Sequence, residues 1–276
     1  MIFINTIQHI KLSKITNYIT SLSRLSTITQ RKVANNDSRV RLAAAYRGLD
    51  QYGLNEGICN HLSAITPSVS GDGDVMLIIP FGLHWKEVTP SLLIGVNEKN
   101  EVVEGNGEPE TTALCIHRGI YSQCPNVKSV MHTHMPYATA LTCLHNPELL
   151  MIHQNSARFH NRIAYDTSYG GLGDSFQEGK RLAQVIGNKD VLFMGNHGVM
   201  TVAQSIAIAF DNMYYLERAA MIQVLAHNTQ KTLREMKPEI VDLTSRQIWT
   251  CLDKYAESHL NVMIRRLRTI SPEFSV

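Results

Sequence analysis

The stretch VKSVMHTHMP, residues 127–136, decides how the rest of the chain is interpreted. Its apolar centre favours a strand, and Pro136 cannot donate to a sheet, so the strand should end there. Side chains alternate between the two faces of a strand, so His132 and His134 should point the same way. Two imidazoles on one face can bind one metal ion. The alternative is a His-x-His pair on a wet strand face without a metal.

A third histidine belongs to a different segment, VLFMGNHGVMTV, residues 191–202. The pattern predicts a strand, a tight turn and a second strand, because Gly195 and Gly198 flank the Asn-His pair. We expect His197 to be exposed at the apex of this turn. Three protein ligands with one open position form the pattern of a catalytic zinc site. The alternative for His197 is a simple hairpin-turn residue.

Composition narrows the class of protein. The chain has 276 residues, of which 44% are hydrophobic and 18% are charged. A net charge of +2 is too small to favour nucleic acid as the main partner. No apolar run reaches the roughly 18 residues of a membrane span. The cysteines are odd in number and form no C-x-x-C pair, which indicates a reducing, cytoplasmic compartment; they are Cys59, Cys115, Cys124, Cys143 and Cys251.

Residues 1–36 differ from the remainder because they contain lysine and arginine but no aspartate or glutamate. This composition is typical of an organelle-targeting segment, and equally of a disordered arm or an over-long start of the reading frame. We therefore expect a basic N-terminal extension over 1–36, disordered or targeting. Residues 37–276 contain no linker or repeat and should form one domain.

Within that domain, periodicity predicts strands and helices in irregular alternation. The expected strands are a short one at the end of the segment 55–65, then 75–79, 92–96, 101–104, 127–135 and 162–165, followed by the hairpin around His197. The expected helices begin at Asp37 or Ser38 and end before Gly53, and then cover 110–124, 137–144, 175–186 capped by Asp174, 203–227 and 246–267. Hairpins between strands argue against a doubly wound parallel sheet and favour a mixed, largely antiparallel sheet covered by helices.

The segments described so far resemble the class II aldolase and adducin family. The resemblance covers roughly residues 37–274. The C-terminal segment 263–274 is similar to the bacterial adducin-like members of the family. It is carried by Asn55–Thr66, Ile79–Pro90, His117–Ala140, Arg162–Gly173 and Leu192–Ala226. It implies an α/β fold, a three-layer α/β/α sandwich around a mixed, mainly antiparallel sheet of nine strands. It also implies a homotetramer with sites at the subunit borders.

The resemblance assigns roles to individual residues. It implies that His132, His134 and His197 bind Zn²⁺ or another divalent metal. In family aldolases such as fuculose-phosphate aldolase, the loop matching residues 58–63 binds the substrate phosphate. Asn60 and Ser63, together with Gly82, are therefore candidates for binding substrate or phosphate. The usual glycine before the asparagine is Cys59 here.

One departure from the family affects catalysis. The aldolases carry an acidic residue four positions before the histidine that matches His117, and that position is Ala113 here. Glu110 lies about one helical turn earlier and is the candidate replacement. Aldol cleavage needs a group that moves protons besides the metal. The adducin head domain resembles this chain, keeps the histidines and likewise lacks the acid.

Three hypotheses follow, and the simplest is a globular protein whose histidines are only structural. The other two assign a function. In the first, the protein is a metal-dependent aldolase-type lyase, or a related epimerase or dehydratase, acting on a small hydroxy-carbonyl compound with or without a phosphate. In the second, it is a non-catalytic adducin-like module that binds actin, spectrin or another protein. We prefer the enzyme, because single-domain members of the family are mostly enzymes. Cytoskeletal adducins also bind their partners largely through regions beyond this domain.

Overall fold

The computed structural model describes residues 2–70 and 73–275, with side chains described from residue 26 onward except at 71–72, 272 and 275. Its elements in chain order are α1 (Ile2–Gln51), β1 (His61–Pro67), β2 (Asp74–Ile78), η1 (Trp85–Glu87), β3 (Ile94–Val96), β4 (Val102–Glu104), α2 (Thr111–Gln123), β5 (Ser129–Thr133), α3 (Pro136–Thr142), α4 (Gln154–Ala157), β6 (Ile163–Asp166), α5 (Phe176–Ile186), β7 (Val191–Met194), β8 (Gly198–Ala203), α6 (Ile206–Asn228), α7 (Pro238–Thr250), α8 (Leu252–Ile270) and η2 (Pro272–Ser275).

The sheet of the described chain has eight strands in the order β4-β3-β2-β1-β5-β8-β7-β6. Every neighbouring pair is antiparallel except β6 and β7, which are parallel. The predicted α/β class with a mixed, mainly antiparallel sheet is confirmed. The ninth strand that the resemblance implied is not among the described residues. β5 lies in the middle of the sheet, hydrogen-bonded to β1 on one side and to β8 on the other.

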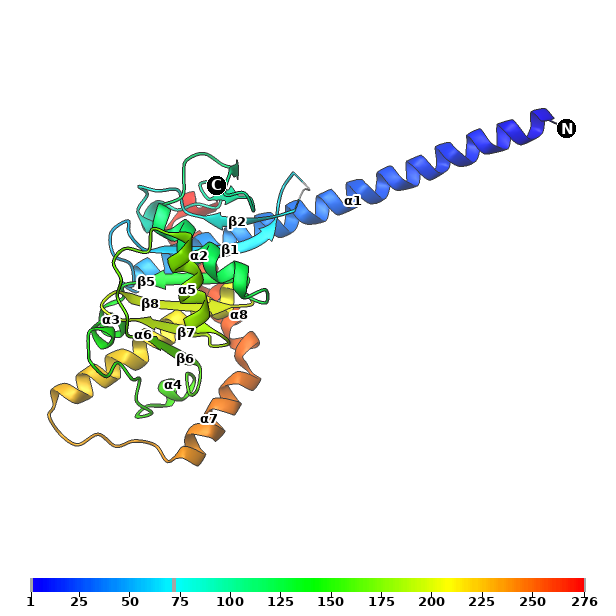
Figure 1. The fold of residues 1–276 in the computed structure, drawn as a ribbon. Coiled ribbons are helices and arrows are strands. Elements are labelled where there is room, and N and C mark those ends of the chain that lie inside the picture. The colour runs from blue at the N-terminus through cyan, green and yellow to red at the C-terminus, as the bar shows by residue number, and fades with distance from the viewer. Residues whose placement is uncertain (1, 71–72, 276) are drawn as a thin grey trace.

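Helices cover both faces of this sheet, which gives the three layers (Figure 1). On one face, α2 and α5 pack on β5, β7 and β8 through a small apolar cluster that includes Ile116, Leu182 and Val130. On the other face, α1, α3, α6 and α8 contribute to the main core, which includes Leu42, Phe210 and many other fully buried side chains. β5 therefore has every side chain buried.

The contact between α2 and α5 is made by backbone atoms. A Cβ atom added at Gly119 would lie 2.1 Å from the backbone of Gly179, and one added at Gly179 would lie 2.1 Å from the carbonyl oxygen of Cys115. The two helices can pack this closely only because neither residue has a side chain. This Gly119/Gly179 crossing fixes the position of α5 over the sheet.

The N-terminal segment differs from the prediction. α1 begins at Ile2, so the helix start predicted at Asp37 or Ser38 is wrong, and residues 2–36 belong to the same helix. Residues 2–47 contain no glycine or proline to stop a helix. Near the former boundary, Asn35 is fully buried and Arg39 forms a 2.7 Å ion pair with the buried Glu104. The first half of α1 projects away from the body (Figure 1). A targeting role for this segment stays a prediction.

Three further boundaries were predicted wrongly. The cap of α5 is Ser175, whose hydroxyl accepts the N–H of Glu178, and not Asp174. The long helix α6 begins at Ile206, because the preceding residues complete β8 and Ser205 caps the helix. The last predicted helix is two helices, α7 and α8, separated at Cys251. Local periodicity cannot detect that last break, since no glycine or proline marks it.

Candidate metal centre

The histidines of β5 are placed by the end of the strand. His132 lies on the face covered by α2 and α5, whereas Thr133 turns to the other face and contacts Met213 of α6. The strand ends at Thr133, so His134 lies one residue beyond it and not within it as predicted. Its backbone N–H donates to Asn60 Oδ1 at 3.1 Å. This bond keeps the chain extended long enough for both imidazoles to lie side by side.

His197 lies in the turn between β7 and β8, as predicted. Asn196 has a φ of 55°, the left-handed conformation that asparagine tolerates. The following Gly198 is required for a different reason, because an added Cβ would lie 2.7 Å from His134 Cδ2 and from the carbonyl oxygen of Thr133. The imidazole of His197 is half-buried, where the sequence predicted exposure. The close approach of the turn to the end of β5 brings the third ring into the cluster.

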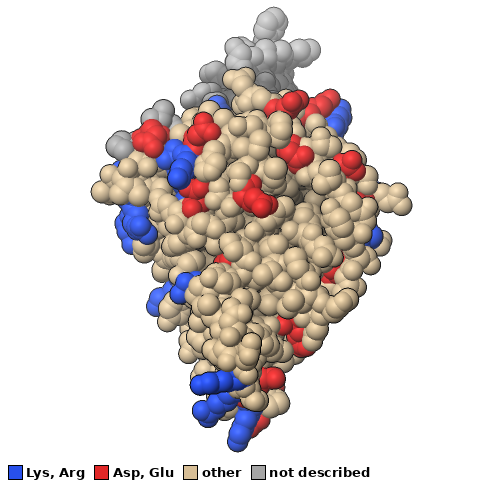
Figure 2. All heavy atoms as spheres, turned by 90° about the vertical axis from the view of Figure 1, so that its left-hand side faces the viewer, with Lys and Arg blue, Asp and Glu red and all other residues tan. Residues whose placement is uncertain are grey.

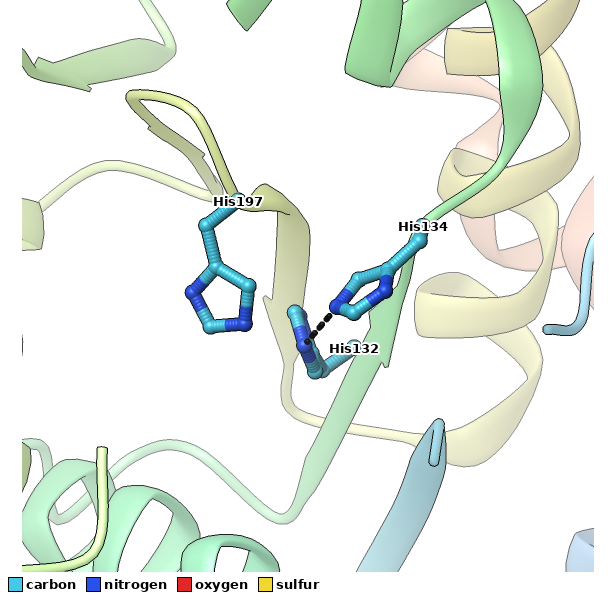
Figure 3. A group of neighbouring side chains, drawn as sticks. All are labelled: His132, His134 and His197. Atoms are coloured by element: carbon cyan, nitrogen blue, oxygen red, sulfur yellow. Dashed lines mark hydrogen bonds between the residues drawn. The ribbon is translucent and has the colours of Figure 1, made fainter. Parts of the chain in front are cut away.

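The three rings converge on one point (Figure 3). One nitrogen of each of His132, His134 and His197 lies within 4.8 Å of the corresponding nitrogens of the other two. The two Nε2 atoms of His132 and His134 are 3.2 Å apart. Ligand nitrogens on a tetrahedral zinc ion, with bonds of about 2.0–2.1 Å, are separated by roughly 3.3 Å. This donor set and spacing fit a divalent metal, and they leave one coordination position free of protein among the described residues.

Hydrogen bonds on the far side of two rings fix which nitrogen faces the cluster. His132 Nδ1 lies 3.0 Å from the carbonyl oxygen of Val199, so Nδ1 carries the proton and donates. His134 Nδ1 bonds to the carboxylate of Glu56. In both residues Nε2 is left with its lone pair toward the centre. Such outer partners are the usual companions of metal-binding histidines, because they fix tautomer and orientation.

The protonation state also favours metal binding. Burial holds the pKa of His132 well below its usual value, and the neighbouring histidines lower it further. Burial, followed by the proximity of His134, lowers the pKa of His197 to about 4. Both imidazoles are therefore neutral at pH 7, and the neutral form is the one that binds metals.

Behind the three histidines lies a buried polar chain that the sequence analysis missed. His61 is the cross-strand partner of His132, and its Nδ1 is 2.8 Å from His117 Nε2 on α2. Ser63 Oγ contacts His117 Nδ1 and lies 2.8 Å from the hydroxyl of Tyr121. The available signal was the pair His61 and Ser63 at strand spacing, opposite His117 and Tyr121 at helical spacing.

The residues predicted to bind substrate separate into two groups. Asn60 is buried beside the cluster, and its Nδ2 has no partner among the described residues, so it has a donor left for a ligand. Ser63 is fully buried, with its hydroxyl engaged behind the histidines. Its position therefore does not support the predicted contact with phosphate. Gly82, with a φ of 92°, lies in an exposed loop between β2 and η1.

The candidate acid also has a structural role. Glu110 is the N-cap residue of α2, and its carboxylate accepts the N–H of Ala113 at 2.8 Å. The structure does not bring this carboxylate into the cluster of three histidines that could hold a metal ion. Ala113 itself is fully buried in the main core. Neither position supplies the proton-transferring group that the aldolase pattern requires.

Fold and site together define an α/β sandwich protein with a candidate three-histidine metal centre at the end of a central strand. Residues 40–224 match the family described as the Class II Aldolase and Adducin N-terminal domain, and the chain belongs to this family. Among the described residues, no helix has the length and apolarity needed to cross a membrane.

Comparison with known proteins finds relatives that are named as adducin-related proteins and relatives that are named as putative aldolases. The chain is 35% identical to an adducin-related protein of Schizosaccharomyces pombe over 78% of this chain and 65% of that one. It is 32% identical to a putative aldolase class 2 protein of Pseudomonas aeruginosa, over 72% of this chain and 75% of that one. The crystal structure of an aldolase II superfamily protein from Pseudomonas syringae is similar, with a TM-score of 0.79 and 28% sequence identity. The match covers 88% of this chain and 96% of that one.

Proposed function

We propose that the protein is a divalent-metal-dependent lyase of the aldolase type, or a related epimerase or dehydratase, acting on a small hydroxy-carbonyl compound with or without a phosphate. The observation that carries this proposal is the metal centre itself. His132 and His134 have their outer nitrogens occupied by Val199 and Glu56, so their inner nitrogens are already directed at a common point. Zinc is the metal that an all-imidazole set with an open position fits best.

Each residue has a defined part in this chemistry. When bound, Zn²⁺ would polarise the carbonyl and hydroxyl oxygens of the substrate and so stabilise the charge that develops as a carbon–carbon bond is cleaved. Glu56 holds the ring of His134 in place. The unpartnered Nδ2 of Asn60 would donate to a substrate oxygen beside the centre. Because Glu110 is engaged in capping α2, water would carry the protons.

The surroundings of the centre fit a small polar ligand or a neighbouring subunit. α3 follows His134 directly, and it lies on the face that Figure 2 shows. On this face, charged side chains occupy the upper part, the flanks and the lower tip, while a central band is mostly uncharged. We propose that this mostly uncharged band takes part in contacts between subunits. The homotetramer and the cytoplasmic location remain part of the proposal.

The second candidate is an adducin-like binding module without catalysis. The fully buried Ala113, in place of the aldolase acid, favours it, as does the similarity to an adducin-related relative. In this case the metal centre would serve the fold, and an actin-type or spectrin-type protein or another protein would be the partner.

One experiment separates the two candidates. The protein is purified, its metal content is measured by elemental analysis, and retro-aldol cleavage of a panel of sugar phosphates and free hydroxy-carbonyl compounds is assayed with Zn²⁺, Co²⁺ or Mn²⁺. The enzyme proposal expects about one metal per chain and turnover that Asn60→Ala reduces. Bound metal without turnover on any compound favours the binding module, which co-sedimentation with actin or spectrin then tests. Absence of metal at saturating zinc contradicts both versions of the site.

A further inference from the structure

A second cleft, with a volume of about 530 Å³, lies on the α2 side of the sheet. This volume falls within the range of small-molecule sites. None of its lining residues belongs to the three-histidine cluster. They come from the strands and hairpins that follow one another across the sheet, and from α2 and α5 above them: Ile65, Asp74, Glu98, Arg118, Tyr121 and Lys180 are representative.

Charges of opposite sign are separated along this cleft. The strand order β4-β3-β2-β1-β5 places Glu98, in the β3–β4 hairpin, and Asp74, at the start of β2, toward one end. Lys128, just before β5, and Lys180, on α5, lie toward the other. Both lysines are exposed and have no ion-pair partner within the described part of the chain, whereas Asp74 has Arg31 at 3.8 Å. Lys128 and Lys180 are therefore free to bind an anion.

The middle of the cleft is rigid and partly apolar. Arg118 is held by hydrogen bonds from its guanidinium to the carbonyl oxygens of Val96 and Asn97, so its position is fixed before any ligand binds. The ring of Tyr121 is anchored through its hydroxyl to Ser63. Phe176, which is 44% exposed, presents an aromatic surface at the wall. A fixed wall with an exposed aromatic ring suits a flat ligand body.

We propose that this cleft is a second ligand site, which binds a small organic phosphate carrying an amino group at its other end. The phosphate would lie against Lys128 and Lys180, the flat body against Phe176, and the amino group would donate to Glu98 or Asp74. Lysine is a suitable phosphate partner because it presents a mobile ammonium group with three donors. The inference is independent of the function proposed for the metal centre, since the two sites share no residue.

Adenosine monophosphate is a suitable probe because it combines a phosphate, a flat ring and an amino group. Binding is measured by calorimetry at low ionic strength, with adenosine and inosine monophosphate as matched compounds that lack the phosphate or the amino group. The proposal expects adenosine monophosphate to bind best. The double variant Lys128→Gln/Lys180→Gln should weaken it about tenfold, since each exposed ionic contact contributes at most about a factor of five. The double control Lys231→Gln/Lys254→Gln removes the same charge at exposed positions outside the cleft and should leave binding unchanged.

Two controls keep the result decisive. Asn60→Ala tests whether the probe binds beside the metal centre instead, and the proposal expects no change there. Glu98→Gln should reduce the preference for adenosine monophosphate over inosine monophosphate. The proposal is overturned if wild-type protein does not bind adenosine monophosphate at millimolar concentration. It is equally overturned if the double lysine variant binds as tightly as wild type, or if Asn60→Ala abolishes binding.

Discussion

Replacing Ala113 by glutamate tests two points together: where α2 lies relative to the core, and whether position 113 is the place of the catalytic acid. If position 113 faced an open cleft, Ala113→Glu would restore the aldolase acid. The structure instead places Ala113 fully buried in the main apolar core. A glutamate there would be buried among apolar side chains, so it should be neutral in the folded protein.

The cost can be worked out from linkage. A glutamate in an apolar site has a pKa of about 8, against about 4.3 in the unfolded chain. The folded state then binds the proton more tightly, so stability is highest below about pH 4 and falls as pH rises toward about 8. Each pH unit in this window costs about 1.4 kcal/mol, which gives about 1 kcal/mol at pH 5 and about 4 kcal/mol at pH 7. Overpacking adds about 1–3 kcal/mol at every pH.

The assay is urea unfolding at pH 5 and pH 7, together with retro-aldol activity in zinc. Ala113→Gln is the matched control, because it adds the same volume without a titratable group. The difference in unfolding free energy between the two variants should grow by about 3 kcal/mol from pH 5 to pH 7. Gln123→Glu, at the exposed end of α2, should show no such slope. The buried position assigned to residue 113 is wrong if the unfolding free energies of Ala113→Glu and Ala113→Gln change equally between pH 5 and pH 7. It is also wrong if Ala113→Glu gains lyase activity.

The remaining predictions concern the metal centre. His134→Ala should lose most of the bound metal in elemental analysis, whereas His153→Ala should keep it, because His153 caps α4; equal metal content in the two variants would contradict the ligand assignment. Glu56→Ala should weaken zinc binding about tenfold in a chelator competition, since the carboxylate orients His134; an unchanged affinity would mean that this contact is incidental. Gly198→Ala should lower both the metal affinity and the melting temperature, because the new Cβ would press against the ring of His134; a wild-type melting curve would refute that contact. The pKa of His197 is lowered to about 4. The neutral ring therefore contributes fully to the stability of the metal-free protein above about pH 6.5, and this contribution is lost as the pH falls toward 4. The unfolding free energies of wild type and His197→Gln, measured in urea, should diverge between these two pH values.

Much of the metal centre could be predicted because its signals are local. The two-residue periodicity of a strand places His132 and His134 together, and the glycines around His197 mark a turn. The order of strands is not local, and only the pairing of β5 with β8 explains why the turn meets the strand end. The resemblance bridged this gap, since spacing alone does not show that segments about 60 residues apart converge.

The wrong predictions share a cause, because in each case residues distant in sequence decide the local conformation. Asp37 and Ser38 are good helix caps, yet the chain continues as helix because nothing before them ends it and because Asn35 and Arg39 are held against the far strand β4 through Glu104. Ser63 was assigned to phosphate binding because the resemblance places it in the loop that binds the substrate phosphate in family aldolases. In the structure Ser63 belongs to β1, and its side chain points toward His117 on α2. This direction becomes clear only when the position of α2 over the sheet is known.

The Gly119/Gly179 crossing has a consequence for how this family can diverge. Neither glycine can be replaced alone, and the two cannot be exchanged gradually, because even a methyl group would force the helices apart. Separating them would carry His117 away from His61 on one side and shift the connection from α5 into β7, which leads to His197, on the other. Loops around the metal centre can therefore drift during evolution, whereas this buried pair of positions should resist change in every descendant that keeps the metal centre.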